Sequence, residues 1–532
     1  MDSEPGTIEP QDSGPSRRDS KHLVAASAIV AATTLAAKAT GLLREAASAA
    51  AFGANRAMDA FVVAKSIPDM VSTWIEMPVR SAFVPLFTRA LEHDGEEQAW
   101  RAASNVLNCV FCLVALLSLL LLFGSSWLVR ALSTGFGSEA AWAEGTRLAQ
   151  VMVLSVAFSV AAFLLGSISN VYRRQIVPGL ARLAGGLVVL AAVVVAGPRF
   201  GLAGYAWGIL AGAIVTFLVQ TDVLWRHRRL YRPILRPRAP EVREMLSLAW
   251  PLFIGLTGTR LDVVIDRNFA SHLPPGHLSL LLYATFLAAT LTELMMNISQ
   301  SVLLPHFSRL AASDQHSELK LRAMQAVASY LFFMAPLTAF VCGAAYPLVR
   351  LVFGRGRFTA EDVALTALLV PILAIADPAF GVGQVFAQAH ISLGDTRTPM
   401  NAGFIRIGFK TATSLLLVPL AGIFGLASSS ALSALLRCWI LWRRLPSSVR
   451  PERLTMFGAV GWFALSAAVG GLGVWGLLAV LPGSDAGPVV QAGRLACAGC
   501  LALVLHLALA WIAGNPLLRM ILASLRSALA SR

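Results

Sequence analysis

Long apolar stretches separated by short polar segments recur along the whole chain. A helix of about 20 apolar residues is long enough to cross a bilayer, so each stretch of that length predicts a membrane-spanning helix. Fourteen stretches qualify, at 22–50, 59–86, 104–130, 145–171, 176–197, 201–225, 244–270, 278–305, 321–350, 361–390, 399–420, 422–442, 456–481 and 489–513. Residues 1–21 are polar and rich in Pro, Gly and Ser, which is typical of a disordered tail.

The first twelve predicted spans form two halves that resemble each other. Four short matches occur in the same order, at offsets of 220 or 221 residues: Pro85 to Arg89 with Pro305 to Arg309, Leu128 to Arg130 with Leu348 to Arg350, Pro178 with Pro399, and Gly201 to Gly204 with Gly422 to Gly425. Repeated halves with a path between them are typical of transporters. We therefore predict an all-α polytopic membrane protein with two six-helix lobes related by an internal repeat and two further C-terminal helices.

The predicted domains are a tail at 1–21, an N-lobe at 22–230, a basic linker at 231–243, a C-lobe at 244–445, and a final part at 446–532 with the last two spans and a second tail. Composition supports the membrane class. The chain is 56% hydrophobic and 14% charged, with a mean hydropathy of +0.68. Soluble proteins carry about 25% charged residues.

The net charge of +14 follows membrane topology. Lys and Arg concentrate in the loops after even-numbered spans, most densely at 226–243, whereas the loops after odd-numbered spans are poor in them except at 350–357. Positive loops favour the cytoplasm, so we predict a multi-pass membrane protein with both termini inside. The run at 226–243 is expected to lie against anionic lipid headgroups, although topology alone would also explain its charge. We predict a monomer without a nucleic-acid partner.

Other chemistry finds little support in the sequence. The sequence contains no G-x-x-x-x-G-K-[ST] loop, so we do not expect ATP hydrolysis. The six cysteines include C-x-x-C pairs at 109–112 and 497–500, but both pairs fall inside apolar spans, where small apolar packing is the simpler explanation. We predict a transporter rather than an enzyme, with no cofactor and no identifiable metal ligands.

Charged residues at membrane depth are then the candidate functional groups, because each costs roughly 2.5–3.5 kcal/mol at a helix centre. Cations gathered on the first spans of each half suit an anionic headgroup, since Arg binds phosphate in a bidentate manner. The candidate substrate-binding residues are Lys38, Arg44, Glu45, Asp59, Glu76, Arg80 and Arg260. The alternative for some charged residues, among them Asp59, Arg267 and Lys410, is a position at the membrane interface.

Three acidic residues of the second half are candidates for ion coupling. Asp262 and Asp266 are four residues apart and so share one helix face. Asp377 precedes Pro378, where a broken helix would free carbonyl oxygens for a Na⁺ ion, H⁺ being the other candidate ion. The alternative is that Asp262 or Asp266 pairs with Arg260 or Arg267 for charge neutrality.

Several motifs stand at the start of each half and in two loops. They are Lys38-Ala-Thr-Gly41-Leu-Leu-Arg44-Glu45, Phe52-Gly53, Asp59-Ala60-Phe61, Pro68, Glu76, Ala82-Phe83-Val84-Pro85, Asp266 to Ser271, Leu273-Pro274, Gly276, Tyr283-Ala284, Phe353 to Gly356, Phe358 to Asp362, and Asp395 to Pro399. Together they resemble the MurJ/MviN lipid II flippases of the multidrug/oligosaccharidyl-lipid/polysaccharide exporter superfamily. The resemblance covers the first twelve predicted spans.

This resemblance implies two six-helix bundles in a V shape around a cationic cavity, and the transport of an undecaprenyl-pyrophosphate-linked saccharide, most simply lipid II. It places the family's essential first-helix arginine at Arg44 and its acidic neighbour at Glu45. Lys38 takes the place of a family arginine. Phe286 stands where the family usually has arginine, and Ser72-Thr73 where members often carry a basic pair.

These departures leave open a flippase for another polyprenyl-linked polysaccharide unit. A cation-coupled multidrug antiporter of the same fold should carry carboxylates rather than arginines in its N-terminal half, and usually stops at twelve spans. A scaffold without transport activity is the third alternative, and it would tolerate loss of the buried charges.

Overall fold

The computed structural model describes residues 17–482 and 487–530, without the side chains of 17–31, 255, 256, 258–260, 291–302, 521, 524, 525 and 528–530. Helices make up most of the described part, which holds no strand. Helices suit a chain in lipid, because they satisfy their backbone hydrogen bonds internally. The first half holds α1 (Arg17–Phe52), α2 (Arg56–His93), α3 (Glu96–Leu132), α4 (Glu139–Met152), α5 (Ser155–Val171), α6 (Ile176–Ala191), α7 (Gly197–Gln220) and α8 (Asp222–Arg226), with short η1 (Thr134–Phe136) and η2 (Ala192–Ala196).

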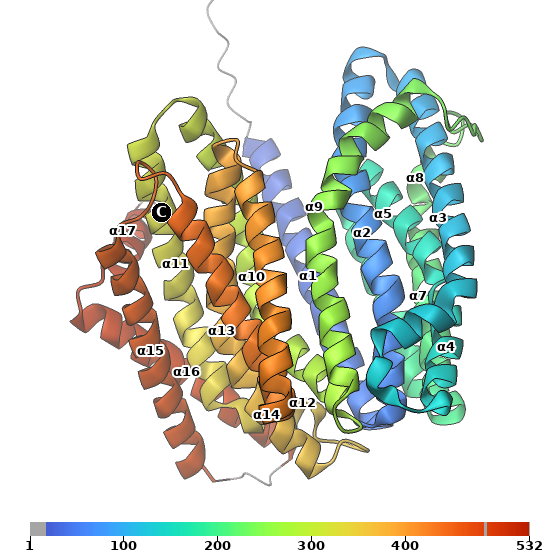
Figure 1. The fold of residues 1–532 in the computed structure, drawn as a ribbon. Helices are drawn as coiled ribbons and strands as arrows, with labels where there is room; N and C mark the ends of the chain where they lie inside the picture. The colour runs from blue at the N-terminus through green and yellow to red at the C-terminus, as the bar shows by residue number, and fades with distance from the viewer. Residues whose placement is uncertain (1–16, 483–486, 531–532) are drawn as a thin grey trace, which may run out of the picture.

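The second half holds α9 (Pro240–Ser271), α10 (His277–Ala312), α11 (His316–Gly343), α12 (Ala345–Phe353), α13 (Ala360–Ser392) and α14 (Arg397–Arg444). The chain then continues through α15 (Arg453–Val480), α16 (Pro488–Ile512) and α17 (Pro516–Ala530). Figure 1 shows α2 to α8 as one group and α10 to α14 as another, with α1 and α9 between them. The predicted all-α polytopic class is confirmed.

Each predicted span lies on helical chain, but the count of fourteen stays a prediction. Eight helical stretches of the described residues are long and apolar enough to cross a membrane by length and composition. Two of them, 176–226 and 397–444, each contain a sharp change of direction and cover two predicted spans. The strongly charged helices α2 and α9 are not among the eight.

The repeated glycine motif marks those two changes of direction. Gly201 has φ 60° and ψ −145°, and Gly422 has φ 55° and ψ −129°, a backbone conformation that favours glycine. The second glycine of each motif admits close packing: a Cβ on Gly425 would lie 2.1 Å from the Leu417 carbonyl oxygen, and one on Gly204 2.9 Å from that of Ala196. The sequence repeat therefore corresponds to two equivalent turns.

The hydrophobic cores show where the two halves meet. One core combines the first part of α2, including Phe61, with Tyr205 of α7, Tyr283 of α10 and Phe353 of α12. At the other end of α2, residues such as Phe87 belong to a core of the first half that the start of α9 joins, while Phe307 of α10 belongs to a core of the second half. Apart from α9, the halves are thus packed together at one end and have separate cores at the other.

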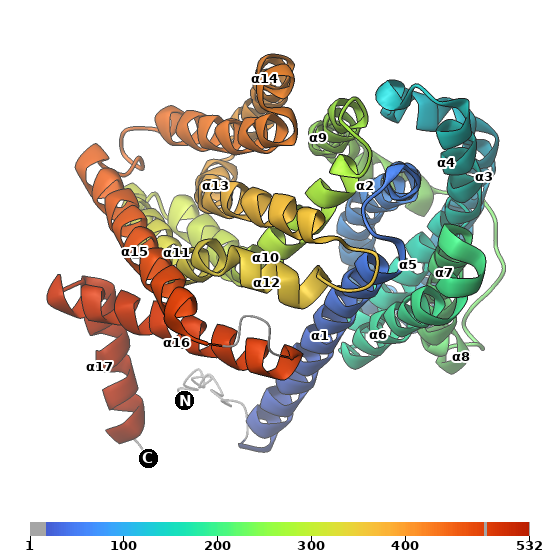
Figure 2. The same cartoon turned by 90° about the horizontal axis from the view of Figure 1, so that it is seen from below.

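The two C-terminal helices α15 and α16 pack on the outer side of the second half, as Figure 2 shows. Val474 of α15 and Ala498 of α16 share a small core with Ala339 of α11. A buried pair, Ser466 Oγ and His506 Nδ1 at 2.6 Å, joins the two helices. The further helix α17 falls where the sequence predicts a tail.

The basic segment between the halves is fixed to α3 rather than loose. Asn105 Oδ1 accepts from the backbone N–H of Arg236 at 2.7 Å, and Asn108 Nδ2 donates to the Ile234 carbonyl at 2.9 Å. Arg232 also pairs with Glu97 at 2.7 Å. The side chains of Arg228, Arg229, Arg236 and Arg238 stay exposed on this fixed backbone.

Candidate functional site

The first predicted site residues meet in a charged cluster between α1 and α2. Arg44 Nη2 donates to Glu45 Oε1 at 2.9 Å, and Lys65 Nζ lies 3.8 Å from the same oxygen. Lys65 also lies 3.9 Å from Asp69 Oδ2. The Glu45 side chain is 3% exposed, whereas that of Arg44 is 26% exposed. The charge of Glu45 is thus compensated by Arg44 and Lys65, and the Arg44 side chain keeps part of its surface available to a ligand.

Arg44 lines a cavity inside the first half. This cavity measures about 550 Å³ and lies among α1, α2, α5, α6 and α7, with Arg44, Asp69, Glu76, Arg182 and Thr216 in its wall. A second cavity of about 550 Å³ shares Glu76, Ser159, Arg182 and Thr216 with the first, and its wall adds the following polar residues: Arg80, Ser167, Asn170, Gln175 and Gln220. The two cavities therefore form one polar region within an apolar lobe.

Sequence reasoning missed Arg182 on α6. Its signal is a single arginine within the otherwise apolar predicted span at 176–197. Arg182 lines both cavities and makes no hydrogen bond or ion pair with the described side chains or backbone. Arg80 lines the second cavity and stacks its guanidinium 5.7 Å from the centre of the Phe163 ring. The three arginines outnumber the two carboxylates, Asp69 and Glu76, in the combined wall.

Two other predicted site residues, Lys38 and Asp59, lie outside this region. Lys38 of α1 is half-buried and lines neither cavity. The side chain of Arg260 lies outside the described residues. Phe286, where the resembled family usually has arginine, packs 3.9 Å from the position that a Cβ on Gly41 would take, so it fills a contact between α10 and α1.

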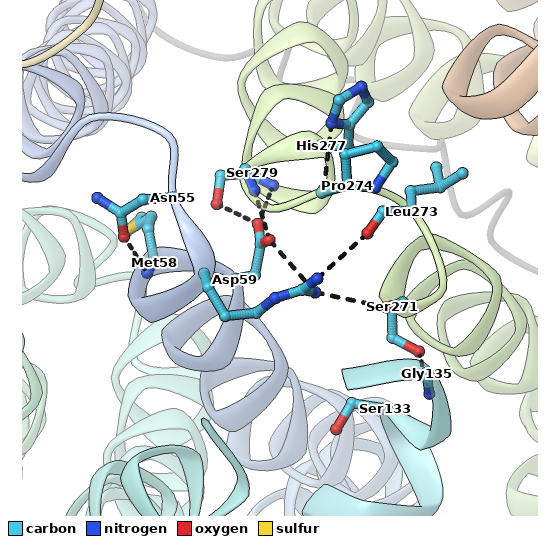
Figure 3. Close-up of polar contacts among 12 residues, drawn as sticks. Asn55, Met58, Asp59, Ser133, Gly135, Ser271, Leu273, Pro274, His277 and Ser279 are labelled. Atoms are coloured by element: carbon cyan, nitrogen blue, oxygen red, sulfur yellow. Dashed lines mark hydrogen bonds and ion pairs between the residues drawn. The ribbon is translucent and has the colours of Figure 1, made fainter. Parts of the chain in front are cut away.

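Asp59 lies at the contact between the halves (Figure 3). Its Oδ2 accepts from the backbone N–H of Gly276 at 2.7 Å, and its Oδ1 accepts from the N–H and hydroxyl of Ser279 at 2.9 and 2.7 Å. Arg56 lies 4.0 Å from Asp59 and donates to the carbonyls of Ser271 and Leu273 at 3.4 Å. The Asp59 side chain is 1% exposed. Its hydrogen bonds hold α2 to the start of α10.

Glycines bring the same end of the halves close together. The Arg357 N–H donates to the Ala50 carbonyl at 2.9 Å. A Cβ on Gly356 would lie 2.2 Å from that carbonyl oxygen, and a Cβ on Gly276 would lie 2.7 Å from that of Ala54. Gly276 and Gly356 have φ of 90° and 61°. These glycines belong to the motifs that resemble the MurJ/MviN family. They lie at the end of the molecule where the two halves are packed together, the closed end.

We expect Asp59→Asn to make this closed end separate more readily, because hydrogen bonds donated to a charged acceptor contribute roughly 1.5–3 kcal/mol each. A cysteine placed at Ser48, which is 0% exposed near Tyr283, would report the opening. In a background without the native cysteines, its maleimide labelling rate should rise roughly tenfold or more. Asp94→Asn, on the exposed turn after α2, is the control, and equal labelling rates in both variants would contradict the prediction.

A second charged network joins α9 to α14. Lys410 Nζ lies 3.0 Å from Asp262 Oδ1 and 2.7 Å from Asp266 Oδ1, and Arg406 Nη1 lies 3.2 Å from Asp262 Oδ1. The Lys410 side chain is 1% exposed. The two aspartates share one helix face, as their spacing predicts. Their charge partners are Lys410 and Arg406, not Arg267, whose Nε donates to Ser66 Oγ of α2 at 2.8 Å.

The third ion-coupling candidate, Asp377, belongs to α13 rather than to α9 or α14. The expectation of a broken helix beside it is wrong. Helix α13 runs from Ala360 to Ser392 through Pro371 and Pro378 without a non-helical residue. Among the described residues, no three His, Cys, Asp or Glu side chains gather where they could hold a metal ion.

The motif from Asp395 to Pro399 is a helix cap. Asp395 Oδ1 accepts from the Thr398 N–H at 3.0 Å, and its Oδ2 lies 3.0 Å from His390 Nδ1. Its slight burial would raise the pKa of the Asp395 carboxyl, but the hydrogen bonds from Thr398 and His390 outweigh that effect and lower it. His390 also reaches the Leu441 carbonyl at 3.0 Å, so this motif fixes the start of α14 to its end.

Comparisons with known proteins agree with this arrangement. The family model described as lipid II flippase MurJ matches residues 48–483. A protein of Rhizobium meliloti (strain 1021) named probable lipid II flippase MurJ is 28% identical over 529 residues, which cover 95% of this chain and 96% of that protein. A lipid II flippase MurJ of Burkholderia cenocepacia is 28% identical over 438 residues, or 78% of this chain and 82% of its own length.

Solved structures show the same fold. A lipid II flippase MurJ in an inward closed conformation aligns with a TM-score of 0.75 and 17% identity, over 91% of this chain and 99% of that one. An inward-facing multidrug resistance MATE transporter of the MOP superfamily aligns with a TM-score of 0.61 and 12% identity, over 81% and 94%. Since the family model covers most of the sequence, from the end of α1 to the end of α15, this chain belongs to the lipid II flippase MurJ family.

Proposed function

We propose that this protein is a flippase that moves an undecaprenyl-pyrophosphate-linked saccharide, lipid II itself, across the bacterial inner membrane. The observation that carries the proposal is the arginine-rich cavity region with Arg44, Arg80 and Arg182 inside an apolar lobe. Arginine is the side chain best suited to grip a phosphate, and its charge is costly in lipid unless an anionic or aqueous partner meets it. The names of the relatives point to the same substrate.

The separate cores support alternating access as the transport mechanism. With both termini in the cytoplasm, the loop between α1 and α2 faces outward, and so does the closed end held by Asp59. The cavity region would then receive its substrate from the cytoplasmic side. Opening the Asp59 contact and closing the opposite end would release the substrate outward. The exposed arginines of the fixed linker would lie against anionic headgroups of the inner leaflet.

The driving force belongs to the proposal as well. Moving one charge across the membrane potential is worth about 2.3 kcal/mol per 100 mV. Of the three residues predicted for Na⁺ or H⁺ coupling, Asp262 and Asp266 are already neutralised by Lys410 and Arg406. Asp377 stays a prediction. A drug antiporter is the weaker alternative, because a cationic drug would meet Arg44, Arg80 and Arg182 in the same cavity region.

Depletion of the protein in its source bacterium tests the function. Lipid II should accumulate and stay inaccessible to a lipid II-cleaving enzyme added outside intact spheroplasts. Re-expression of the wild-type chain should restore access, and growth with it. Accumulation of a different polyprenyl-linked glycan would identify that glycan as the substrate, and no accumulation of any would exclude the flippase function.

A further inference from the structure

We propose that the second cavity of the N-terminal half is the binding site for the saccharide of the lipid-linked substrate, with Gln220 as its hydrogen-bond acceptor and Arg182 as the residue between saccharide and pyrophosphate. This assignment rests on the proposed flippase function and deepens it. The cavity lies among α2, α5, α6 and α7 and measures about 550 Å³, within the range of about 300–1,000 Å³ that is usual for ligand sites.

The strongest observation concerns Gln220 at the end of α7, whose side-chain oxygen Oε1 receives no hydrogen bond within the described part of the protein. Its side chain lines the cavity, and the residue is 3% exposed. A buried acceptor without a donor costs roughly 1–3 kcal/mol. A ligand hydroxyl or amide N–H would remove that cost, and a saccharide with N-acetyl groups supplies both.

A glycine in the neighbouring helix α5 leaves room for the Gln220 amide. Gly166 of α5 lines the same cavity, and a Cβ there would lie 2.8 Å from Gln220 Nε2. Any larger residue at this position would push the Gln220 side chain from its place. The glycine therefore keeps a polar side chain in a lobe where apolar packing would otherwise be favoured.

The rest of the wall offers further polar groups without a competing partner. Asn170 and Gln175 line the cavity and make no side-chain hydrogen bond with the described residues. Ser167 Oγ donates to the Phe163 carbonyl at 2.9 Å, and Thr216 Oγ1 donates to that of Gly212 at 2.8 Å, so each hydroxyl oxygen keeps acceptor capacity. Amides and hydroxyls of this kind suit the many hydroxyls of a sugar.

The charges of the wall indicate how the substrate is oriented. Arg182 lines this cavity and the one that contains Arg44, so it lies where the two adjoin. With the pyrophosphate at Arg44, Arg182 meets its sugar-proximal phosphate, and the saccharide extends toward Gln220 and Arg80. Glu76 lines both cavities and limits the positive charge of the region.

Binding of two lipids to the purified full-length protein separates these roles. The probes are lipid II and undecaprenyl pyrophosphate, which has the same anionic group but no sugar. Gln220→Leu should weaken lipid II binding roughly tenfold and leave undecaprenyl pyrophosphate binding unchanged, since one hydrogen bond to the sugar is lost. Arg182→Met should weaken binding of both lipids, because it removes a phosphate contact.

Gln388→Leu is the matched control. Gln388 of α13 is 8% exposed and also has an unpartnered Oε1, but it lies in the second half, outside both cavities. Its variant should bind both lipids as the wild type does, and thermal melting of all variants reports their folding. Equal effects of Gln220→Leu on the two lipids, or equal effects of Gln220→Leu and Gln388→Leu, would overturn the saccharide site. If the wild type binds neither lipid, the proposed function itself fails.

Discussion

Replacing Arg44 with alanine should abolish transport of lipid II while the protein still folds. Arg44 is the cation of the α1–α2 cluster that lines the first cavity, and it retains exposed surface for a ligand. Loss of a charged partner from a buried, hydrogen-bonded pair costs roughly 2–5 kcal/mol of binding, which corresponds to about thirtyfold or more. Folding should survive because Lys65 remains 3.8 Å from Glu45 and continues to compensate its charge.

The measurement is transport by proteoliposomes that contain equal amounts of wild-type or variant protein. Arg44→Lys should keep part of the activity, because the charge remains but the planar fork that binds two phosphate oxygens does not. Arg101→Ala, at an exposed position near the start of α3, is the control and should transport normally. Transport at the wild-type rate in Arg44→Ala would remove the cavity from the mechanism.

The lobes could be predicted because their sequence signals are local or repeated. Apolar length indicates a helix at each span, and the offset of 220 or 221 residues aligns the two halves. The repeat even includes Gly201 and Gly422, which prove to be the turns within 176–226 and 397–444. Apolar length alone does not give the number of spans, since helices such as α2 combine that length with many charges.

The partners of the buried charges could not be predicted, because they come from helices distant in the sequence. Spacing places Asp262 and Asp266 on one helix face, but it does not reveal that Lys410, 148 residues after Asp262, lies between them. Asp59 resembles a substrate-binding residue in the sequence because its hydrogen-bond donors, Gly276 and Ser279, are more than 200 residues away. Only the packing of α10 beside α2 shows that these donors already bind its carboxylate.

The cavity region shows residues whose role the sequence did not reveal at all. Arg182 was overlooked because one arginine in an apolar span resembles a residue that reaches the membrane interface. Gln220 stands at the end of its span, where polar residues are ordinary. Only the packing of α5, α6 and α7 brings these side chains into one wall. Sequence patterns therefore predict which helices form, but not which of their polar residues face a common cavity.

The largest loss of stability is expected for Lys410→Met. Lys410 is fully buried, and its ammonium neutralises two carboxylates of α9 at 3.0 and 2.7 Å. Without it, Arg406 still pairs with Asp262 at 3.2 Å, whereas Asp266 loses its ion-pair partner. Removing one partner of a buried ion pair typically costs 3–5 kcal/mol, because the remaining charge is left uncompensated in a medium of low dielectric constant. We expect α9 to separate from α14 and the apparent melting temperature in detergent to fall strongly.

A second substitution distinguishes lost charge balance from lost packing. Lys410→Met with Asp266→Asn removes both charges and should recover most of the lost stability, since a buried ion pair is often replaceable by neutral groups. The exposed pair between Glu318 and Arg322, 2.8 Å apart on α11, provides the control. Arg322→Met should cost at most about 1 kcal/mol, because surface ion pairs contribute little. A double variant as unstable as Lys410→Met alone would contradict the prediction, because it would show that the uncompensated charge of Asp266 is not what destabilises the single variant.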